Sequence, residues 1–151
     1  MARVDFYHLQ NKKLEEVLPK ILEKAYETGK NVKIKVGTTE RVEFLNSALW
    51  TYDEESFIPH GTKKDGNADI QPIYLSDSDD NPNSAEFLFL VDGAMIEDLG
   101  DFSRVFNIFD GDSSEALTKA REFWKELKAS GENELFYWQM DAKSGRWEQK
   151  A

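Results

Sequence analysis

The sequence predicts an α/β protein, a layered single-domain fold with a parallel sheet. Strand-like and helix-like segments alternate over the first fifty residues, which is typical of this class. The chain has 151 residues, the size of one domain that can bury a full core. It shows no internal repeat and no linker long enough to divide it, so residues 1–151 are expected to form one domain.

Residues 4–9 alternate and are rich in aromatic side chains, which predicts a first strand. Residues 14–26 repeat apolar side chains with the 3.6-residue period of an amphipathic helix. Pro19 predicts a kink within this helix because it removes one backbone hydrogen bond. Gly29 is expected to end it.

The alternation of Val32, Ile34 and Val36 predicts the second strand. Thr38 or Thr39 can cap the helix that follows. Further along, residues 52–69 are expected to form a loop, and residues 76–84 an acidic polar hairpin loop between two strands. Later strands are expected at residues 70–75, 86–91, 105–109 and 135–140, with a turn at Ser144-Gly145.

A helix is expected over residues 113–130, between a cap at Asp112 or Ser113 and Gly131. Arg121, Lys125 and Lys128 share one of its faces, within an arc of roughly 60°. We call these three residues the basic stripe.

Trp124 lies at the edge of the basic stripe, beside the apolar face of the helix. Two interpretations fit: a solvated helix flank next to a core tryptophan, or a site for an acidic partner with aromatic side chains. The stripe has no acidic partner at i±4 on its own face, which favours the second. Its cations also complement the helix dipole, which favours the first.

Composition excludes several classes of function. The net charge of −10 argues against general nucleic-acid binding, which needs net cationic contacts. The absence of cysteine excludes thiolate metal sites and fits a reducing cytoplasm. No apolar run approaches the ~20 residues that span a bilayer, and residues 1–8 lack the shape of a signal peptide.

No catalytic or cofactor-binding set can be assigned. Residues 9–13 lack the glycines of a dinucleotide fold, so no nucleotide site and no cofactor is expected. The spacing of Asp77, Asp79 and Asn81 resembles a calcium loop, but Pro82 replaces the required glycine, so no metal is expected. An enzyme with a small-molecule site near Asp110-Gly111 remains an alternative.

The histidines give no support for a catalytic triad, because no serine or aspartate partner can be assigned to either. His8 lies in a predicted strand and is expected to be packed, whereas His60 lies in the predicted loop.

A second segment of interest joins the end of the second helix to its loop, where Trp50 and Phe57 are prominent among the apolar residues. Apolar side chains on a loop indicate either core packing or a protein interface. Pattern alone leaves both open.

Over essentially its whole length, the chain resembles the chi subunit family of bacterial DNA polymerase III. The resemblance rests on Val4-Asp5-Phe6-Tyr7, Ala48-Leu49-Trp50, Ser56-Phe57-Ile58-Pro59-His60, Pro72-Ile73, Asp101-Phe102, Arg121-Glu122 and Trp124-Lys125. It implies a single-domain three-layer α/β/α sandwich with a mostly parallel central sheet, Rossmann-like but without a nucleotide site and without catalytic activity.

The resemblance also implies a role as a cytoplasmic accessory subunit associated with the clamp loader. Such a subunit links the replicase to the acidic C-terminal tail of single-stranded-DNA-binding protein. By position, Arg121, Trp124, Lys125 and Lys128 match the tail pocket, with Trp124 where a tyrosine is familiar. Trp50 and Phe57 match the psi-subunit surface, and a repair helicase in place of psi is the alternative partner.

Overall fold

The computed structural model of the protein describes all residues except 1, 52–58, 97–98, 101 and 142. In this part of the chain, eight strands form one sheet in the order β3-β4-β2-β5-β6-β1-β7-β8. The strands are β1 (Arg3–Leu9), β2 (Val32–Lys35), β3 (Gly61–Thr62), β4 (Ile73–Ser76), β5 (Phe87–Leu90), β6 (Arg104–Asp110), β7 (Glu134–Met140) and β8 (Trp147–Gln149). The helices are α1 (Leu14–Glu27), α2 (Thr39–Thr51), α3 (Ser114–Ser130) and the short 3₁₀ helices η1 (Lys63–Asp65) and η2 (Ala68–Ile70).

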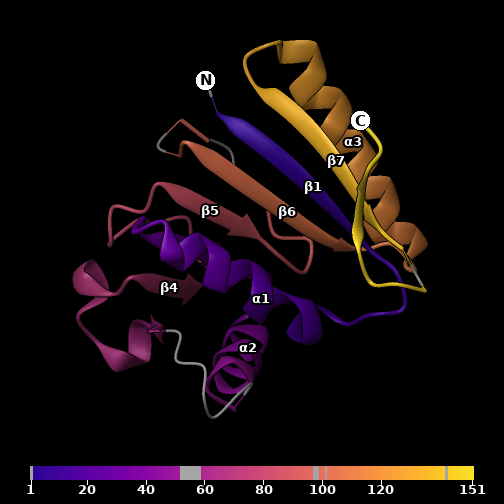
Figure 1. The fold of residues 1–151 in the computed structure, drawn as a ribbon. Helices are drawn as coiled ribbons and strands as arrows, with labels where there is room; N and C mark the ends of the chain where they lie inside the picture. Colours follow the sequence, from indigo (N-terminus) through magenta and orange to yellow (C-terminus); the bar gives the residue numbers. More distant parts are fainter. Residues whose placement is uncertain (1, 52–58, 97–98, 101, 142) are drawn as a thin grey trace.

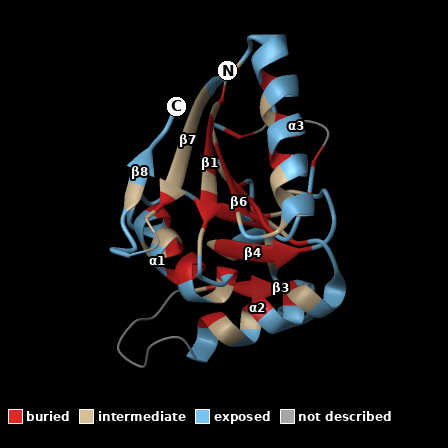
Figure 2. Ribbon diagram, turned by 90° about the vertical axis from the view of Figure 1, so that its right-hand side faces the viewer, coloured by how far each residue is buried: buried red, intermediate tan, exposed pale blue. Residues whose placement is uncertain are grey.

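Helices cover both faces of the sheet, so the predicted three-layer α/β/α arrangement is confirmed (Figure 1). Successive side chains of β1 point alternately into the two layers of the core, one on each face of the sheet. Tyr7 and Leu9 face the layer that contains α1 and α2, whereas Val4 and Phe6 face α3. The buried residues accordingly run through the centre of the molecule, between the helices (Figure 2).

Every described strand pair is parallel except β7 with β8, which confirms the mostly parallel sheet. Two short strands at the ends of the sheet were not predicted. Strand β3 lies inside the expected loop 52–69, and β8 follows the Ser144-Gly145 turn. Both are too short to carry a clear alternation, so only their neighbours in space define them.

The strand predicted at residues 70–75 was wrong at its start. Ile70 belongs to the 3₁₀ helix η2 and is 71% exposed, and β4 begins only at Ile73. Pro72 has no backbone N–H to donate to the ladder, so pairing starts after it, although its carbonyl accepts a hydrogen bond from Val32.

The hairpin loop predicted at residues 76–84 was wrong, because β4 and β5, which flank residues 77–86, both pair in parallel with β2 from opposite sides. The segment therefore has to cross β2. Two lysines of β2 hold it there: Lys33, which is fully buried, pairs with Asp80 at 3.1 Å, and Lys35 pairs with Asp79. Burial lowers the pKa of Lys33, and the Asp80 carboxylate acts against that shift.

The predicted helix ends agree with the structure at several points. The side chain of Thr38 accepts a hydrogen bond from the backbone N–H of Arg41 at the start of α2. Gly29 has a positive φ of 80° directly after α1, the conformation that glycine adopts without strain. Helix α1 runs through Pro19, which is buried within it.

Candidate functional site: the basic stripe of α3 and the Trp50 surface

Helix α3 begins and ends as the sequence predicts. The Ser113 hydroxyl accepts a hydrogen bond from the N–H of Ala116 at 3.2 Å, and Gly131 ends the helix with a φ of 68°. Ala120, Phe123 and Leu127 are buried against the sheet. These contacts fix the rotation of the helix, and therefore the direction in which its other faces point.

The three cations of the basic stripe are all exposed on the flank of α3. Arg121, Lys125 and Lys128 make no ion pair with any residue that the structure describes. The stripe is therefore not explained by helix-stabilising pairs, and its charge is available to a partner.

Trp124 is half-buried beside the stripe, and it belongs partly to the core. Its ring meets Phe6 edge-on at 5.2 Å between centroids and Tyr137 at 5.9 Å. The interpretation of Trp124 as a core residue is confirmed in part, since contacts with the sheet hold its ring in a fixed position. The remainder of its surface is apolar, and a role in binding a partner stays a prediction.

Behind Trp124, His8 of β1 and Tyr137 of β7 form a polar contact that sequence reasoning missed. His8 Nδ1 and the Tyr137 hydroxyl are hydrogen-bonded at 2.7 Å. The alternation of side chains in residues 4–9 and 135–140 places both residues on the face of the sheet that α3 covers. This alternation was the sequence signal from which the contact could have been found. His8 is packed, as predicted, being 8% exposed.

The charge of Arg121 affects the pKa values of both His8 and Tyr137. Burial lowers the pKa of His8, Asp112 opposes that shift and Arg121 reinforces it, so the ring is neutral at pH 7. Burial raises the pKa of Tyr137, and Arg121 acts against it. The positive charge of Arg121 therefore disfavours a proton on His8 and favours deprotonation of the Tyr137 hydroxyl.

At the other predicted surface, Trp50 lies in the last turn of α2 and is 49% exposed. Its ring lies 4.2 Å from the ring of His60, which is buried and whose Nε2 lies 3.2 Å from the carbonyl oxygen of Asn46. Trp50 is thus presented at the surface rather than packed in the core. Phe57, the second residue predicted here, lies outside the described residues.

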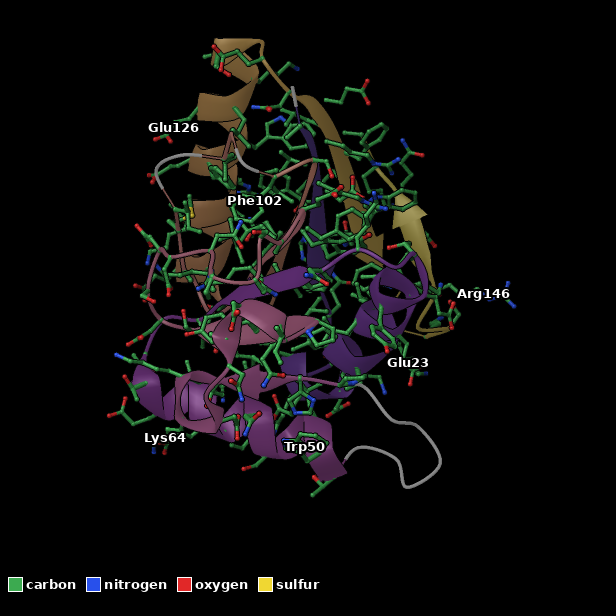
Figure 3. The ribbon with its side chains drawn as sticks, turned by 90° about the vertical axis from the view of Figure 1, so that its left-hand side faces the viewer. Glu23, Trp50, Lys64, Phe102, Glu126 and Arg146 are labelled. Carbon is green, nitrogen blue, oxygen red and sulfur yellow. The ribbon has the colours of Figure 1, made fainter. Side chains whose placement is uncertain are left out.

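The two surfaces are at opposite ends of the molecule. Figure 3 shows Trp50 at the far end from Glu126, which lies on α3, and Figure 1 shows α2 and α3 separated by the sheet. The structure therefore does not bring Trp50 together with the basic stripe.

The carboxylates of the acidic segment, residues 76–84, interact with other side chains of the protein. Asp77 accepts a hydrogen bond from Thr39 at 2.9 Å, and Asp79 and Asp80 pair with the two lysines of β2. Among the described residues, no group of three or more histidine, cysteine, aspartate or glutamate side chains could hold a metal ion. Over the same residues, no helix has the length and apolar character to cross a membrane.

Comparison with known proteins identifies the family. The family model described as "DNA polymerase III chi subunit, HolC" matches residues 1–133. The chain belongs to the DNA polymerase III chi subunit family. It is also similar to the "Probable DNA polymerase III subunit chi" of Rickettsia prowazekii (strain Madrid E), with 34% identity over 109 residues that cover 70% of this chain. The matched part spans 66% of that relative, just under two thirds of its length.

The chi family match includes α3 with the whole basic stripe, and Trp50 of α2. It ends before β7 and β8, which supply Tyr137 and Trp147. Part of the aromatic wall behind Trp124 therefore comes from a segment beyond the family match.

Proposed function

We propose that this protein is a non-catalytic accessory subunit of the DNA polymerase III holoenzyme, associated with the clamp loader. In this proposal the basic stripe and Trp124 bind the acidic C-terminal tail of single-stranded-DNA-binding protein. The Trp50 surface, to which we assign Phe57 by resemblance, docks the psi subunit. The observation that carries the proposal is a set of exposed cations that form no ion pair within the described part of the chain and lie beside the fixed ring of Trp124.

The chemistry of the stripe suits a peptide that ends in a carboxylate and an aromatic ring. Arg121 can hold a carboxylate in a two-pronged hydrogen bond, whereas Lys125 and Lys128 act as point charges. An aromatic side chain of the tail would lie against Trp124, whose orientation Phe6 and Tyr137 already fix. A wall that is fixed before binding loses little entropy when the ligand arrives.

The ion pairs and the burial of the aromatic ring should contribute unequally to the affinity for the tail. Exposed ion pairs contribute only about 0–1 kcal/mol each, so burial of the aromatic ring should provide much of the affinity. The cations should mainly provide orientation, association rate and salt dependence. A contact of this size gives weak binding, which several tails on one assembly would strengthen through effective concentration.

We expect Lys125→Glu to weaken tail binding by about tenfold at low salt, because it replaces one attraction by a repulsion. The measurement is a fluorescence-anisotropy titration of a labelled tail peptide at two salt concentrations. Lys20→Glu is the matched control, since Lys20 is an exposed lysine on α1 and carries the same charge change. Equal affinities of the two variants would contradict the assignment of the tail to α3.

At the other end, we expect Trp50→Ala to abolish capture of the psi subunit while tail affinity stays unchanged, because the two surfaces lie far apart. The measurement is a pull-down with purified psi, with circular dichroism to verify the fold and the tail titration as internal control. Capture of psi by Trp50→Ala at the wild-type level would exclude this surface. Capture of a repair helicase that depends on Trp50, in place of psi, would support the alternative adaptor role.

A further inference from the structure

The basic stripe borders one particular neighbour, strand β7. Lys119, on the other flank of α3, reaches the loop after β5, since its Nζ lies 3.6 Å from the position that a β-carbon on Gly93 would take. Trp124 instead contacts Tyr137 of β7. At about 100° per residue, the centre of the stripe lies roughly 70° from Trp124 and roughly 150° from Lys119. The stripe is therefore on the flank that faces β7, beside which α3 runs (Figure 1).

The side chains of β7 on this face of the sheet are covered only in part by α3. Leu135, Tyr137 and Gln139 alternate along the strand and point to the α3 side. We call these three residues the β7 surface. All three are half-buried, so part of each side chain is accessible beside the stripe. The β7 surface spans about 13 Å along the strand and the stripe roughly 10 Å along the helix, lengths that match about three to four residues of an extended peptide.

The β7 surface combines an apolar part with one polar group. Leu135 and Tyr137 pack on the same core cluster as Trp124, and the rings of Tyr137 and Trp124 lie 5.9 Å apart. The hydrogen bond of 2.7 Å to His8 fixes the position of the Tyr137 ring. The Gln139 amide hydrogen-bonds to no residue in the described part of the chain, so its donor and its acceptor are both available to a partner.

The charges on the two sides of the β7 surface differ. On the β8 side, Glu148 is the register partner of Gln139 and pairs with Lys150 at 3.0 Å, so these two charges cancel. On the α3 side, the stripe carries three positive charges that form no ion pair with any described residue, in a chain whose net charge is −10. An acidic peptide with an aromatic side chain complements this arrangement better than a basic or an aliphatic one.

We propose that the β7 surface is part of the tail site, and that the tail lies between α3 and β8. Its aromatic ring would contact Tyr137 as well as Trp124, and its backbone would pair with the Gln139 amide. This inference rests on the proposed function and extends it, because the family match ends at residue 133 and β7 begins at Glu134. Tyr137 and Gln139 are then determinants of tail specificity in this chain, in addition to the four residues of α3.

The first test is an NMR titration of the ¹⁵N-labelled full chain with the tail peptide. We expect the side-chain NH₂ signals of Gln139 to shift together with the indole N–H signal of Trp124. The NH₂ signals of Gln149 should stay in place, because Gln149 lies opposite Trp138 and so on the other face of the sheet. A shift of the Trp124 signal without a shift at Gln139 would overturn the proposal.

A pair of glutamine variants measures the contribution of the amide. Gln139→Ala should weaken tail binding about fivefold, the effect of one hydrogen bond. Gln149→Ala is the matched control on the neighbouring strand, and its affinity should equal that of the wild type. Equal affinities of the two variants would show that the tail does not reach Gln139.

A gain of affinity provides an independent test. Glu148→Lys should strengthen tail binding roughly threefold at about 0.15 M salt, since it turns the neutral side of the β7 surface cationic. Glu134→Lys is the matched control, because it makes the same charge change on β7 but on the opposite face.

The outcome at Lys125 separates this inference from the proposed function. If Lys125→Glu weakens tail binding while the Gln139 and Glu148 variants behave like their controls, the tail binds at α3 and only the assignment of β7 is wrong. If Lys125→Glu binds the tail as tightly as its own control does, the proposed function fails, and the inference that rests on it fails as well.

Discussion

Replacing Gly111 with alanine should lower the free energy of unfolding by about 3 kcal/mol, at the upper end of overpacking effects. A β-carbon at this position would stand 1.9 Å from two atoms of the His8 ring and 2.5 Å from the carbonyl oxygen of Leu9. The ring cannot simply turn away, because it is hydrogen-bonded to Tyr137 and packed against Phe109. Either the loop after β6 or the strand β1 must move.

Urea denaturation of the two proteins measures this loss. Gly145→Ala is the matched control, since a β-carbon there meets no atom within 4 Å and only the positive φ of 72° opposes it. That conformational cost is about 1–2 kcal/mol. We also expect Gly111→Ala to weaken tail binding, because Tyr137 supports Trp124. A loss no larger than that of Gly145→Ala would show that the backbone accommodates the methyl group.

Asp5→Ala should cost about 3–5 kcal/mol, the range found when one partner of a buried ion pair is removed. The Asp5 carboxylate is completely buried, where Arg3 Nε donates to it at 2.9 Å and Arg104 forms a second ion pair. Both arginines are partly exposed, with 40% and 31% of their side chains accessible. Water can therefore solvate them after the change, which places the expected loss near 3 kcal/mol.

The measurement is again urea denaturation, with Asp79→Ala as the control. Asp79 is paired as well, but with one lysine, and 61% of its side chain is exposed. Its removal should therefore lower the free energy of unfolding by less than about 1 kcal/mol. The loss of stability in Asp5→Asn should lie between the losses in Asp5→Ala and Asp79→Ala, since the amide keeps the shape of the carboxylate but not its charge. Equal losses at positions 5 and 79 would mean that the buried carboxylate contributes no more than a surface pair.

The layered fold could be predicted because long apolar patterns in α1, α3 and β1 define which face of each element is buried. The basic stripe could be predicted for the same reason, because the buried face of α3 determines the direction in which Arg121 and Lys128 point. Strand β3 and the crossing of β2 by residues 77–86 could not be predicted, because they depend on which strands become neighbours.

The supporting residues of the site show the same limit. His8 and Tyr137 are 129 residues apart in sequence and meet only because β1 and β7 are paired. Trp50 could be recognised as a candidate for an interface, but its exposure required the fold.

The placement of α2 and α3 at opposite ends of one continuous sheet has a thermodynamic consequence. Two ligands held at such ends would share no contacts, and the paired strands of one sheet join the two elements. The coupling free energy between the two binding events should then be close to zero, so occupancy of one end leaves the affinity of the other unaltered. Under the proposed function, the protein would behave as a passive connector whose joint occupancy is the product of two independent ones, and each attachment could be released without disturbing the other.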